Sequence, residues 1–229
     1  MNANHGNVKY FYAKHYSELI GHRSSGLLSL LWRYPHKLLE AGHRSNVDFA
    51  ILEIGAGEGE HVGFVSQDFD KYVMSDIDHE RLSKSENANK DRRIEFKAAD
   101  ATNLPFSENE FDRTIATCLL IHLLEPELAL NEWRRVTKPG GIIDIYLPCE
   151  PGIMLRLFRK LTTKRKAEKS GFTGYDLFMA RDHLTSTHRL VELISFVFHE
   201  DQINFKYRPF VFRSWYFNLF VTVRIRLNK

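Results

Sequence analysis

Apolar positions follow a helical spacing at the start of the chain and then alternate between strand-like and helix-like segments. Between residues 10 and 40 the leucines form a broad helical face with Pro35 as an interruption, which predicts two helical pieces. Short apolar runs predict buried strands at 49–54, 71–76, 94–98, 111–117 and 142–146, with helices at 62–69, 78–89 and 125–136 between them. This alternation is typical of βαβ units, in which helices cover both faces of a parallel sheet.

The pattern changes after residue 146. We expect a helix at 153–161, then a stretch rich in Lys and Arg, then a loop-rich segment around Gly171 and Gly174. A further helix is predicted at 188–195. Residues 203–207 and 219–225 alternate like strands, and we interpret them as an antiparallel pair that finishes the sheet.

Composition narrows the class of protein. With 229 residues, 43% of them hydrophobic and 27% charged, the chain is typical of one folded domain and is not a disordered protein. The first residues lack the apolar run of a secretory signal, and no stretch approaches the roughly 20 apolar residues of a membrane span. Cys118 and Cys149 have no metal-ligand spacing. We therefore expect a cytoplasmic protein without a metal site.

Charge is divided unevenly along the chain. Residues 1–150 carry 17 basic and 23 acidic side chains, whereas residues 151–229 carry 15 basic and 6 acidic ones. Seven cations between positions 156 and 169 favour an acceptor that bears phosphate or lies at a membrane, such as a lipid-linked or nucleotide-linked sugar. A solvated helix face is the alternative. We expect no nucleic-acid partner, because the chain has no recognised RNA-binding module and its first part is acidic.

A glycine-rich loop follows the first predicted strand. Gly55, Gly57 and Gly59 alternate just past the carboxyl end of that strand, where ligands bind in open α/β sheets. A tight turn without a ligand is the alternative. The dinucleotide fingerprint requires its third glycine at position 60, which is Glu here, and Glu58 and Glu60 would repel a pyrophosphate. A ligand that lacks phosphate or carries positive charge fits better.

Acidic residues end the neighbouring predicted strands. Asp76 is placed to accept hydrogen bonds from ribose hydroxyls, and Asp100 ends the third strand at the same edge. Together with Glu53, they suit an adenosine that carries an ammonium or sulfonium group. For each Asp alone, a helix N-cap or turn role is the alternative.

Five segments in chain order carry a resemblance to a known family. They read ILEIGAGEG (51–59), SDID (75–78), ADATNLPF (99–106), FD through LLIH (111–122) and RVTKPGG (135–141). Over residues 49–146 the chain resembles the class I S-adenosylmethionine-dependent methyltransferases, most of all the branch with ubiquinone, menaquinone and small-molecule enzymes. The aromatic run 209–220 is similar to methyltransferases of bacterial surface-polysaccharide clusters. The resemblance implies a Rossmann-like, doubly wound, seven-stranded sheet whose last strand is antiparallel.

The resemblance also implies the cofactor, S-adenosylmethionine, and the residues that bind it. The glycine loop would lie against its methionine part, with Glu53 near the ammonium group. Asp76 would bind the ribose, and Ile77 would pack on the adenine. Asp100 would bond the adenine amino group. The implied binding set is Glu53, Gly55, Ala56, Gly57, Gly59, Asp76, Ile77, Asp100, Ala101, Thr117, Cys118 and Leu119.

In such a reaction the sulfonium already activates the methyl group, so the protein has to place an acceptor atom roughly 3 Å away and in line. An oxygen acceptor also benefits from a general base. The candidates are His122, Tyr16 and His15, followed by His22 and His183. His122 lies at the carboxyl edge of the predicted sheet, where a role in fixing its loop is the alternative. For the N-terminal candidates the alternative is a packing helix.

We therefore expect one methyltransferase domain that moves a methyl group to oxygen or nitrogen of a small-molecule, sugar or lipid-linked acceptor. A catalytically silent cofactor-binding module and an NAD-linked oxidoreductase are the alternatives. The expected parts are a helical cap (1–45), a cofactor core (46–147), a basic substrate-side segment (148–202) and terminal antiparallel strands (203–229). The basic third would be the part in contact with a membrane surface, for example the inner membrane. The oligomeric state has no sequence signal.

Overall fold

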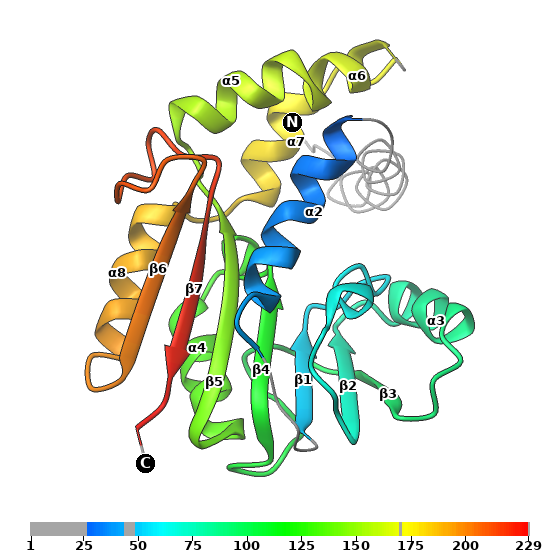
Figure 1. The fold of residues 1–229 in the computed structure, drawn as a ribbon. Helices are drawn as coiled ribbons and strands as arrows, with labels where there is room; N and C mark the ends of the chain where they lie inside the picture. The colour runs from blue at the N-terminus through cyan, green and yellow to red at the C-terminus, as the bar shows by residue number, and fades with distance from the viewer. Residues whose placement is uncertain (1–26, 44–48, 170, 229) are drawn as a thin grey trace, which may run out of the picture.

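The computed structural model of the chain is built on one seven-stranded sheet with the strand order β3-β2-β1-β4-β5-β7-β6 (Figure 1). It describes residues 27–43, 49–169 and 171–228. The strands are β1 (Ala50–Ile54), β2 (Lys71–Asp76), β3 (Ile94–Ala98), β4 (Phe111–Thr117), β5 (Thr137–Pro148), β6 (Gln202–Arg208) and β7 (Phe220–Arg226). Strands β1 to β5 pair in parallel, and β7 is antiparallel to both β5 and β6. The predicted Rossmann-like sheet with its antiparallel last strand is confirmed.

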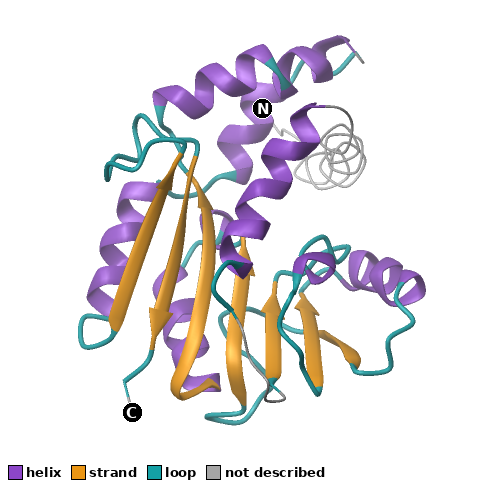
Figure 2. Cartoon of the chain, viewed as in Figure 1, coloured by secondary structure: helices purple, strands orange, loops and turns teal. Residues whose placement is uncertain are grey.

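Helices cover both faces of this sheet, as predicted. They are α2 (Leu27–Glu40), α3 (His79–Ala88), α4 (Pro126–Val136), α5 (Ile153–Leu161), α6 (Thr163–Lys169), α7 (Tyr175–Asp182) and α8 (Thr187–Val197). In Figure 2, α4 and α8 lie behind the strands and α2 lies in front of them. The larger core lies on the α4 side, where Trp133 and Ile194 pack with apolar side chains of the strands. Among the described helices, none is long and apolar enough to cross a bilayer.

The helix expected at 62–69 is wrong. Only one short 3₁₀ turn, η2 (Val62–Phe64), forms there. The main-chain N–H of Ser66 donates to a carboxylate oxygen of Glu40 at 3.3 Å instead of to a carbonyl one helical turn earlier. A side chain from 26 positions upstream therefore replaces the local hydrogen bond that a helix needs.

Two further expectations differ in detail. α2 continues through Pro35 as one helix, and the other predicted helical piece lies outside the described residues. The segment around Gly171 and Gly174 is less loop-rich than expected, because α6 and α7 flank these glycines.

A buried guanidinium joins α2 to the sheet. Arg113 of β4 donates to both carboxylate oxygens of Glu40 (2.7 and 3.1 Å) and, through Nε, to Asp144 of β5 (2.8 Å). All three side chains are at most 5% exposed. Burial alone would raise the pKa of Glu40, but hydrogen bonds from His61 and Arg113 lower it to about 2. The carboxylate is therefore charged and fully engaged.

The same network reaches β7 and the segment after α2. Asp144 accepts hydrogen bonds from His43 (2.7 Å) and from Nε of Arg224 (2.7 Å). Burial would raise the pKa of Asp144, but Arg113, His43 and Arg224 together hold it well below its usual range. One chain of ion pairs thus links α2, β4, β5 and β7.

A histidine pair completes the network under α2. Nε2 of His61 donates to Glu40 at 3.0 Å, and the Nδ1 atoms of His36 and His61 lie 2.9 Å apart. This contact needs a lone pair on one of the two nitrogens. Burial, and then the neighbouring His61, lowers the pKa of His36 to about 3. His36 is therefore neutral at physiological pH.

Replacing Arg113 by Met should lower the free energy of unfolding by about 3–5 kcal/mol, because Glu40 and Asp144 would keep buried charges without their partner. Urea unfolding measures the change. Arg93→Met is the matched control, since that guanidinium is 48% exposed and pairs with Asp68 and Asp91 at the surface. The control should lose no more than about 1 kcal/mol. Equal losses in the two variants would contradict the role given to Arg113.

His36 and Glu40 should make stability fall with acid. The pKa values of His36 and Glu40 are depressed from 6.5 and 4.5, so both groups bind protons more tightly in the unfolded chain. Their contribution is complete above pH 6.5. It declines below that pH through His36 and below pH 4.5 through both groups, by up to ~1.4 kcal/mol per pH unit for each.

Urea unfolding at a series of pH values between 7.5 and 4.5 measures this slope. His36→Gln should remove the contribution of His36, so acidification from pH 7.5 to 4.5 should destabilise the variant less than the unaltered protein, whatever the variant does to stability at pH 7.5. An unchanged slope would show that His36 is not the group responsible.

Candidate functional site

The glycine loop has a backbone that only glycine adopts easily. Gly55, Gly57 and Gly59 have φ angles of 70°, 55° and 82°, in the left-handed region. A Cβ atom on Gly55 would lie 2.9 Å from a methyl carbon of Leu119, and one on Gly57 would lie 2.4 Å from the Arg81 guanidinium. The N–H of Ala56 donates to the carbonyl of Ser75 at 2.9 Å, which ties the loop to β2. The loop is thus a tight cradle at the ends of β1, β2 and β4.

Asp76 is oriented by two main-chain donors. One carboxylate oxygen accepts from the N–H of Gly57 and the other from the N–H of Asp78, both at 2.8 Å. Asp78, not Asp76, is the N-cap of α3, because it accepts from the first N–H groups of that helix. The N-cap alternative for Asp76 is therefore excluded. Its carboxylate is a fixed acceptor beside the glycine loop, and each oxygen keeps a further lone pair.

The neighbouring strand end is arranged differently. Asp100 is exposed and accepts from both the N–H and the hydroxyl of Thr102 at 2.8 Å, which lowers its pKa. This is the turn role that the sequence left open. Ala101 is buried, and its carbonyl accepts from the indole of Trp133. Ile77 is 75% exposed, so its side chain is accessible to an aromatic ring of a ligand. Adenine binding by these residues stays a prediction.

Glu53 lies beneath the loop, not on its surface. Its side chain is 1% exposed and accepts from the hydroxyl of Tyr72 at 2.7 Å. Burial raises the pKa of Glu53, and it raises that of Tyr72 well above its usual value. Contact of Glu53 with a cofactor ammonium group stays a prediction; a cation nearby would lower this pKa.

A second tight turn follows β4. Cys118 has a φ of 58°, and its N–H donates to the carbonyl of Tyr146 on β5 at 2.9 Å. The turn directs the chain into the 3₁₀ helix η3 (Leu120–His122), whose His122 donates its main-chain N–H to Leu119 at 2.9 Å. The side chain of Leu119 lies against Gly55, so the turn that leads into His122 borders the glycine loop. Thr117 ends β4 beside this turn.

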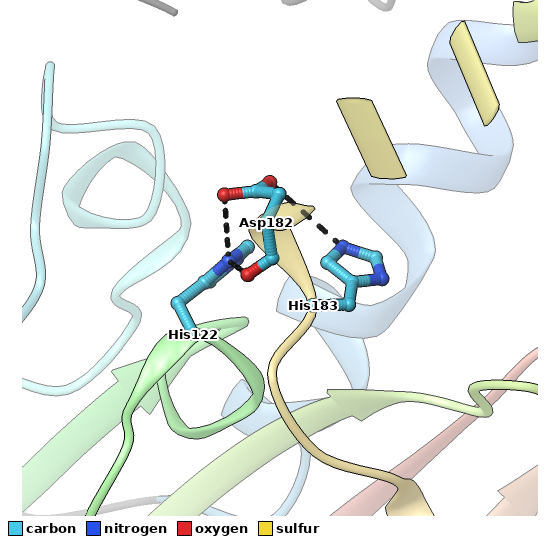
Figure 3. Close-up of side chains that lie close together, drawn as sticks. All are labelled: His122, Asp182 and His183. Carbon is cyan, nitrogen blue, oxygen red and sulfur yellow. Dashed lines mark hydrogen bonds and ion pairs between the residues drawn. The ribbon is translucent and has the colours of Figure 1, made fainter. Parts of the chain in front are cut away.

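His122 lies against the end of α7, which supplies Asp182 and His183 (Figure 3). Nδ1 of His122 lies 2.9 Å from the main-chain carbonyl of Asp182 and 3.1 Å from its carboxylate. Nε2 of His183 lies 4.0 Å from the other carboxylate oxygen. Burial raises the pKa of Asp182 to about 7. The sequence named both histidines but missed Asp182, whose position directly before His183 was the only local signal.

These contacts fix the tautomer of His122. A main-chain carbonyl can only accept, so Nδ1 carries the proton and neutral His122 has its lone pair on Nε2. Such an imidazole can act as a general base. The bond also ties η3 to α7, so the loop-fixing role is present as well. His122, Asp182 and His183 each offer a ligand atom within 4.8 Å of the others, a spacing that would also admit a metal ion. A metal ion bound to Nδ1 of His122 would break the hydrogen bond between that nitrogen and the main-chain carbonyl of Asp182.

A further pair connects this cluster to α5. His183 lies 3.5 Å from a carboxylate oxygen of Glu150, which is also paired with Arg159. Burial would raise the pKa of Glu150, but His183 and Arg159 lower it. The buried side of α5 is therefore joined to the residues around His122.

The structure thus brings the glycine loop, Asp76, Leu119 and His122 together and places Asp100 at the next strand end. His15, Tyr16 and His22 lie outside the described residues.

Comparisons with known proteins agree with this geometry. A family model described as a methyltransferase domain matches residues 52–145. The demethylmenaquinone methyltransferase of Clavibacter sepedonicus is 39% identical over 124 residues, which are 54% of this chain and 41% of that protein. The enzyme of the same name from Paenarthrobacter aurescens is 45% identical over 71 residues, 31% of this chain and 27% of that protein. The chain therefore spans less than half the length of these relatives.

Solved structures share the fold at low sequence identity. A chain from the complex between the Haloferax volcanii Trm112 methyltransferase activator and a putative methyltransferase has a TM-score of 0.63 at 14% identity, covering 88% of this chain and 92% of that one. A putative S-adenosylmethionine-dependent methyltransferase of Methanococcus maripaludis has a TM-score of 0.62 at 17% identity, covering 93% and 92%. At this identity the likeness shows the fold alone.

Asp76→Ala should weaken binding of S-adenosylhomocysteine by about 10-fold or more, because hydrogen bonds to a charged acceptor contribute about 1.5–3 kcal/mol. His122→Ala should change the affinity by less than about 3-fold, since an imidazole that serves the acceptor adds little to cofactor binding. Titration calorimetry measures both, with NAD as a ligand that should give no binding.

Asp78→Ala is the matched control. It removes the N-cap of α3, two residues from Asp76, and should leave the affinity near that of the unaltered protein. Equal losses in the Asp76 and His122 variants, or a larger loss in the latter, would reject the assignment.

Proposed function

We propose that the chain transfers a methyl group from S-adenosylmethionine to a small-molecule acceptor, because residues 52–145 match a family model described as a methyltransferase domain. The acceptor carries an ionisable hydroxyl group, and His122 removes its proton. The strongest support is that Leu119 lies against Gly55 and accepts a main-chain hydrogen bond from His122, whose ring is bonded to Asp182.

The cradle fits this cofactor better than a dinucleotide. Gly55 and Gly57 hold the loop in a left-handed backbone just past the end of β1, and Asp76 offers two oriented oxygens to a ribose diol. Glu58 and Glu60 at the loop would repel a pyrophosphate but not a sulfonium. These observations favour the methyltransferase over the NAD-linked alternative.

When bound, the cofactor supplies a methyl group that its sulfonium already activates. The protein's part is to hold the acceptor in line and to receive its proton. Nε2 of His122 takes the proton, while the Asp182 carbonyl keeps Nδ1 protonated and the ring in place. A positioned base of this kind contributes typically 10²–10⁴-fold.

The relatives narrow the choice of acceptor. Two of them are named demethylmenaquinone methyltransferases. The reduced form of such a quinone is a hydroquinone, which has hydroxyl groups of the kind that His122 would deprotonate. A sugar hydroxyl on a lipid-linked carrier is the second candidate, because exposed cations such as Arg156 and Lys160 lie in the segment beyond the core. Demethylmenaquinol and a lipid-linked sugar are therefore the first acceptors to test, with tRNA as the negative control.

A turnover assay with labelled S-adenosylmethionine tests the proposal. Label should enter one of the two small acceptors and not tRNA. Cofactor binding without transfer to any fraction of a whole-cell extract would favour the catalytically silent module.

His122→Asn should lower kcat by about 10²–10⁴-fold and leave cofactor affinity unchanged. Asp182→Asn should cost less, because the main-chain carbonyl still accepts from His122. His199→Asn is the matched control, since that histidine is 68% exposed on a surface segment. Full activity of the His122 variant, or a deeper loss in the Asp182 variant, would refute the base role.

A further inference from the structure

Eight large apolar side chains stand exposed on two neighbouring segments, α5 and the loop 209–217 that joins β6 to β7. They are Ile153, Leu157, Leu161, Phe210, Val211, Phe212, Tyr216 and Phe217, and we refer to them as the α5–loop surface. Val211 is 83% exposed and Leu161 is 62% exposed. A soluble monomer rarely gathers so much apolar surface in one place without a partner.

The two segments form one surface. The N–H of Met154 donates to the carbonyl of Tyr216 at 3.3 Å. Gly152 lies so close to the loop that a Cβ there would be 2.5 Å from the carbonyl of Trp215. Figure 1 shows α5 and the loop at the same end of the sheet, the end to which the arrow of β5 points.

The loop holds its aromatic rings outward through a buried side chain. Asn218 is fully buried, and its amide accepts from the N–H of Phe210 (2.8 Å) and donates to the carbonyls of Phe212 (3.2 Å) and Ser214 (2.8 Å). The rings of Phe210 and Phe212 stack at 5.3 Å. The exposure of these rings therefore follows from a fixed loop shape.

Only cations accompany this surface in the sequence. Residues 151–167 and 202–229 contain no Asp or Glu. Ile153, Leu157 and Leu161 recur at four-residue intervals on one side of α5, and the exposed Arg156 and Lys160 lie beside that stripe. Arg213 adds an exposed cation to the loop.

We propose that the α5–loop surface docks on an anionic lipid bilayer. Apolar and aromatic side chains flanked by Lys and Arg are the pattern by which a segment lies in a membrane interface. A second copy of the chain would set these cations against each other across a twofold interface, with no carboxylate between them. A single-stranded nucleic acid would find no stacking face on Ile153, Leu157 or Leu161.

Docking has a consequence for the site, and this consequence rests on the proposed function. The buried face of α5 carries Arg159, which is paired with Glu150, and Glu150 lies 3.5 Å from His183. A membrane against the outer face of α5 would therefore lie one helix away from His122, Asp182 and His183, on the side from which an acceptor dissolved in the bilayer would arrive.

Flotation of the full chain with lipid vesicles tests the docking itself and needs no acceptor or cofactor. Vesicles of phosphatidylcholine with about 30% phosphatidylglycerol should bind the protein, and vesicles of phosphatidylcholine alone should bind it much less. Raising the salt from about 0.1 M to about 0.5 M should weaken the binding.

Two pairs of variants separate the contribution of the apolar side chains to vesicle binding from that of the cations. Val211→Ser with Phe212→Ser should lower the vesicle affinity at least about 10-fold, whereas Phe196→Ser, on α8 and more exposed than Phe212, should not. Arg156→Gln with Lys160→Gln should lower it by about 5-fold for each cation removed. Arg92→Gln with Lys90→Gln is the matched charge control on another part of the surface. All of these side chains are exposed, so the melting temperature should stay unchanged.

Equal binding to both kinds of vesicle, or no difference between the surface variants and their controls, would overturn the proposal. So would a concentration-dependent dimer that Phe212→Ser dissociates, which would make the occupant a second copy. Binding of single-stranded RNA in place of vesicles would identify a nucleic acid instead. A loss of methyl transfer in the His122 variant leaves all these readouts unaffected, so the two proposals fail separately.

Discussion

The buried guanidinium of Arg113 is the constraint on which the arrangement of the chain depends. A charge without access to water must be met by charged partners, and here they come from two different elements, Glu40 of α2 and Asp144 of β5. Asp144 in turn holds Arg224 of β7, so a single set of ion pairs fixes a helix and three strands relative to one another. The same carboxylate of Glu40 takes the N–H of Ser66 and thereby prevents a helix after the glycine loop. The approach to the cofactor cradle is thus shaped by a residue in the middle of β4.

Two tight turns, at the carboxyl ends of β1 and β4, form the candidate site on this sheet. The left-handed backbone at Gly55 and at Cys118 turns the chain just past the ends of the neighbouring strands β1 and β4, and the Leu119 side chain lies against Gly55. His122 follows within one turn of the chain and is held by Asp182. The division of charge along the sequence matches the division between the candidate site and the α5–loop surface. The acidic part contains the cradle that we assign to a cationic cofactor, and the basic part contains the surface that we assign to an anionic membrane.

The sequence was most informative where structure depends on neighbours along the chain. Strands β2, β3 and β4 were predicted at their observed bounds, because short runs of buried residues between turn signals have few other solutions. The places of Asp76 and Gly55 at strand ends also followed from the sequence, and their cofactor-binding roles stay predictions. What the sequence did not reveal depends on distant contacts. The partner of Ser66 lies 26 residues away, and Asp182 meets His122 across 60 residues. Neither pairing leaves a local pattern.

The central claim is that the cofactor's reactive atom lies between the glycine loop and His122. A crystal structure of the full chain with S-adenosylhomocysteine measures this most directly. We expect the ribose hydroxyls on Asp76 and the sulfur beside Leu119, with Nε2 of His122 facing the sulfur across a gap wide enough for one acceptor atom. A sulfur that lies on the far side of the glycine loop from His122, or a ligand that leaves Asp76 without contact, would contradict it.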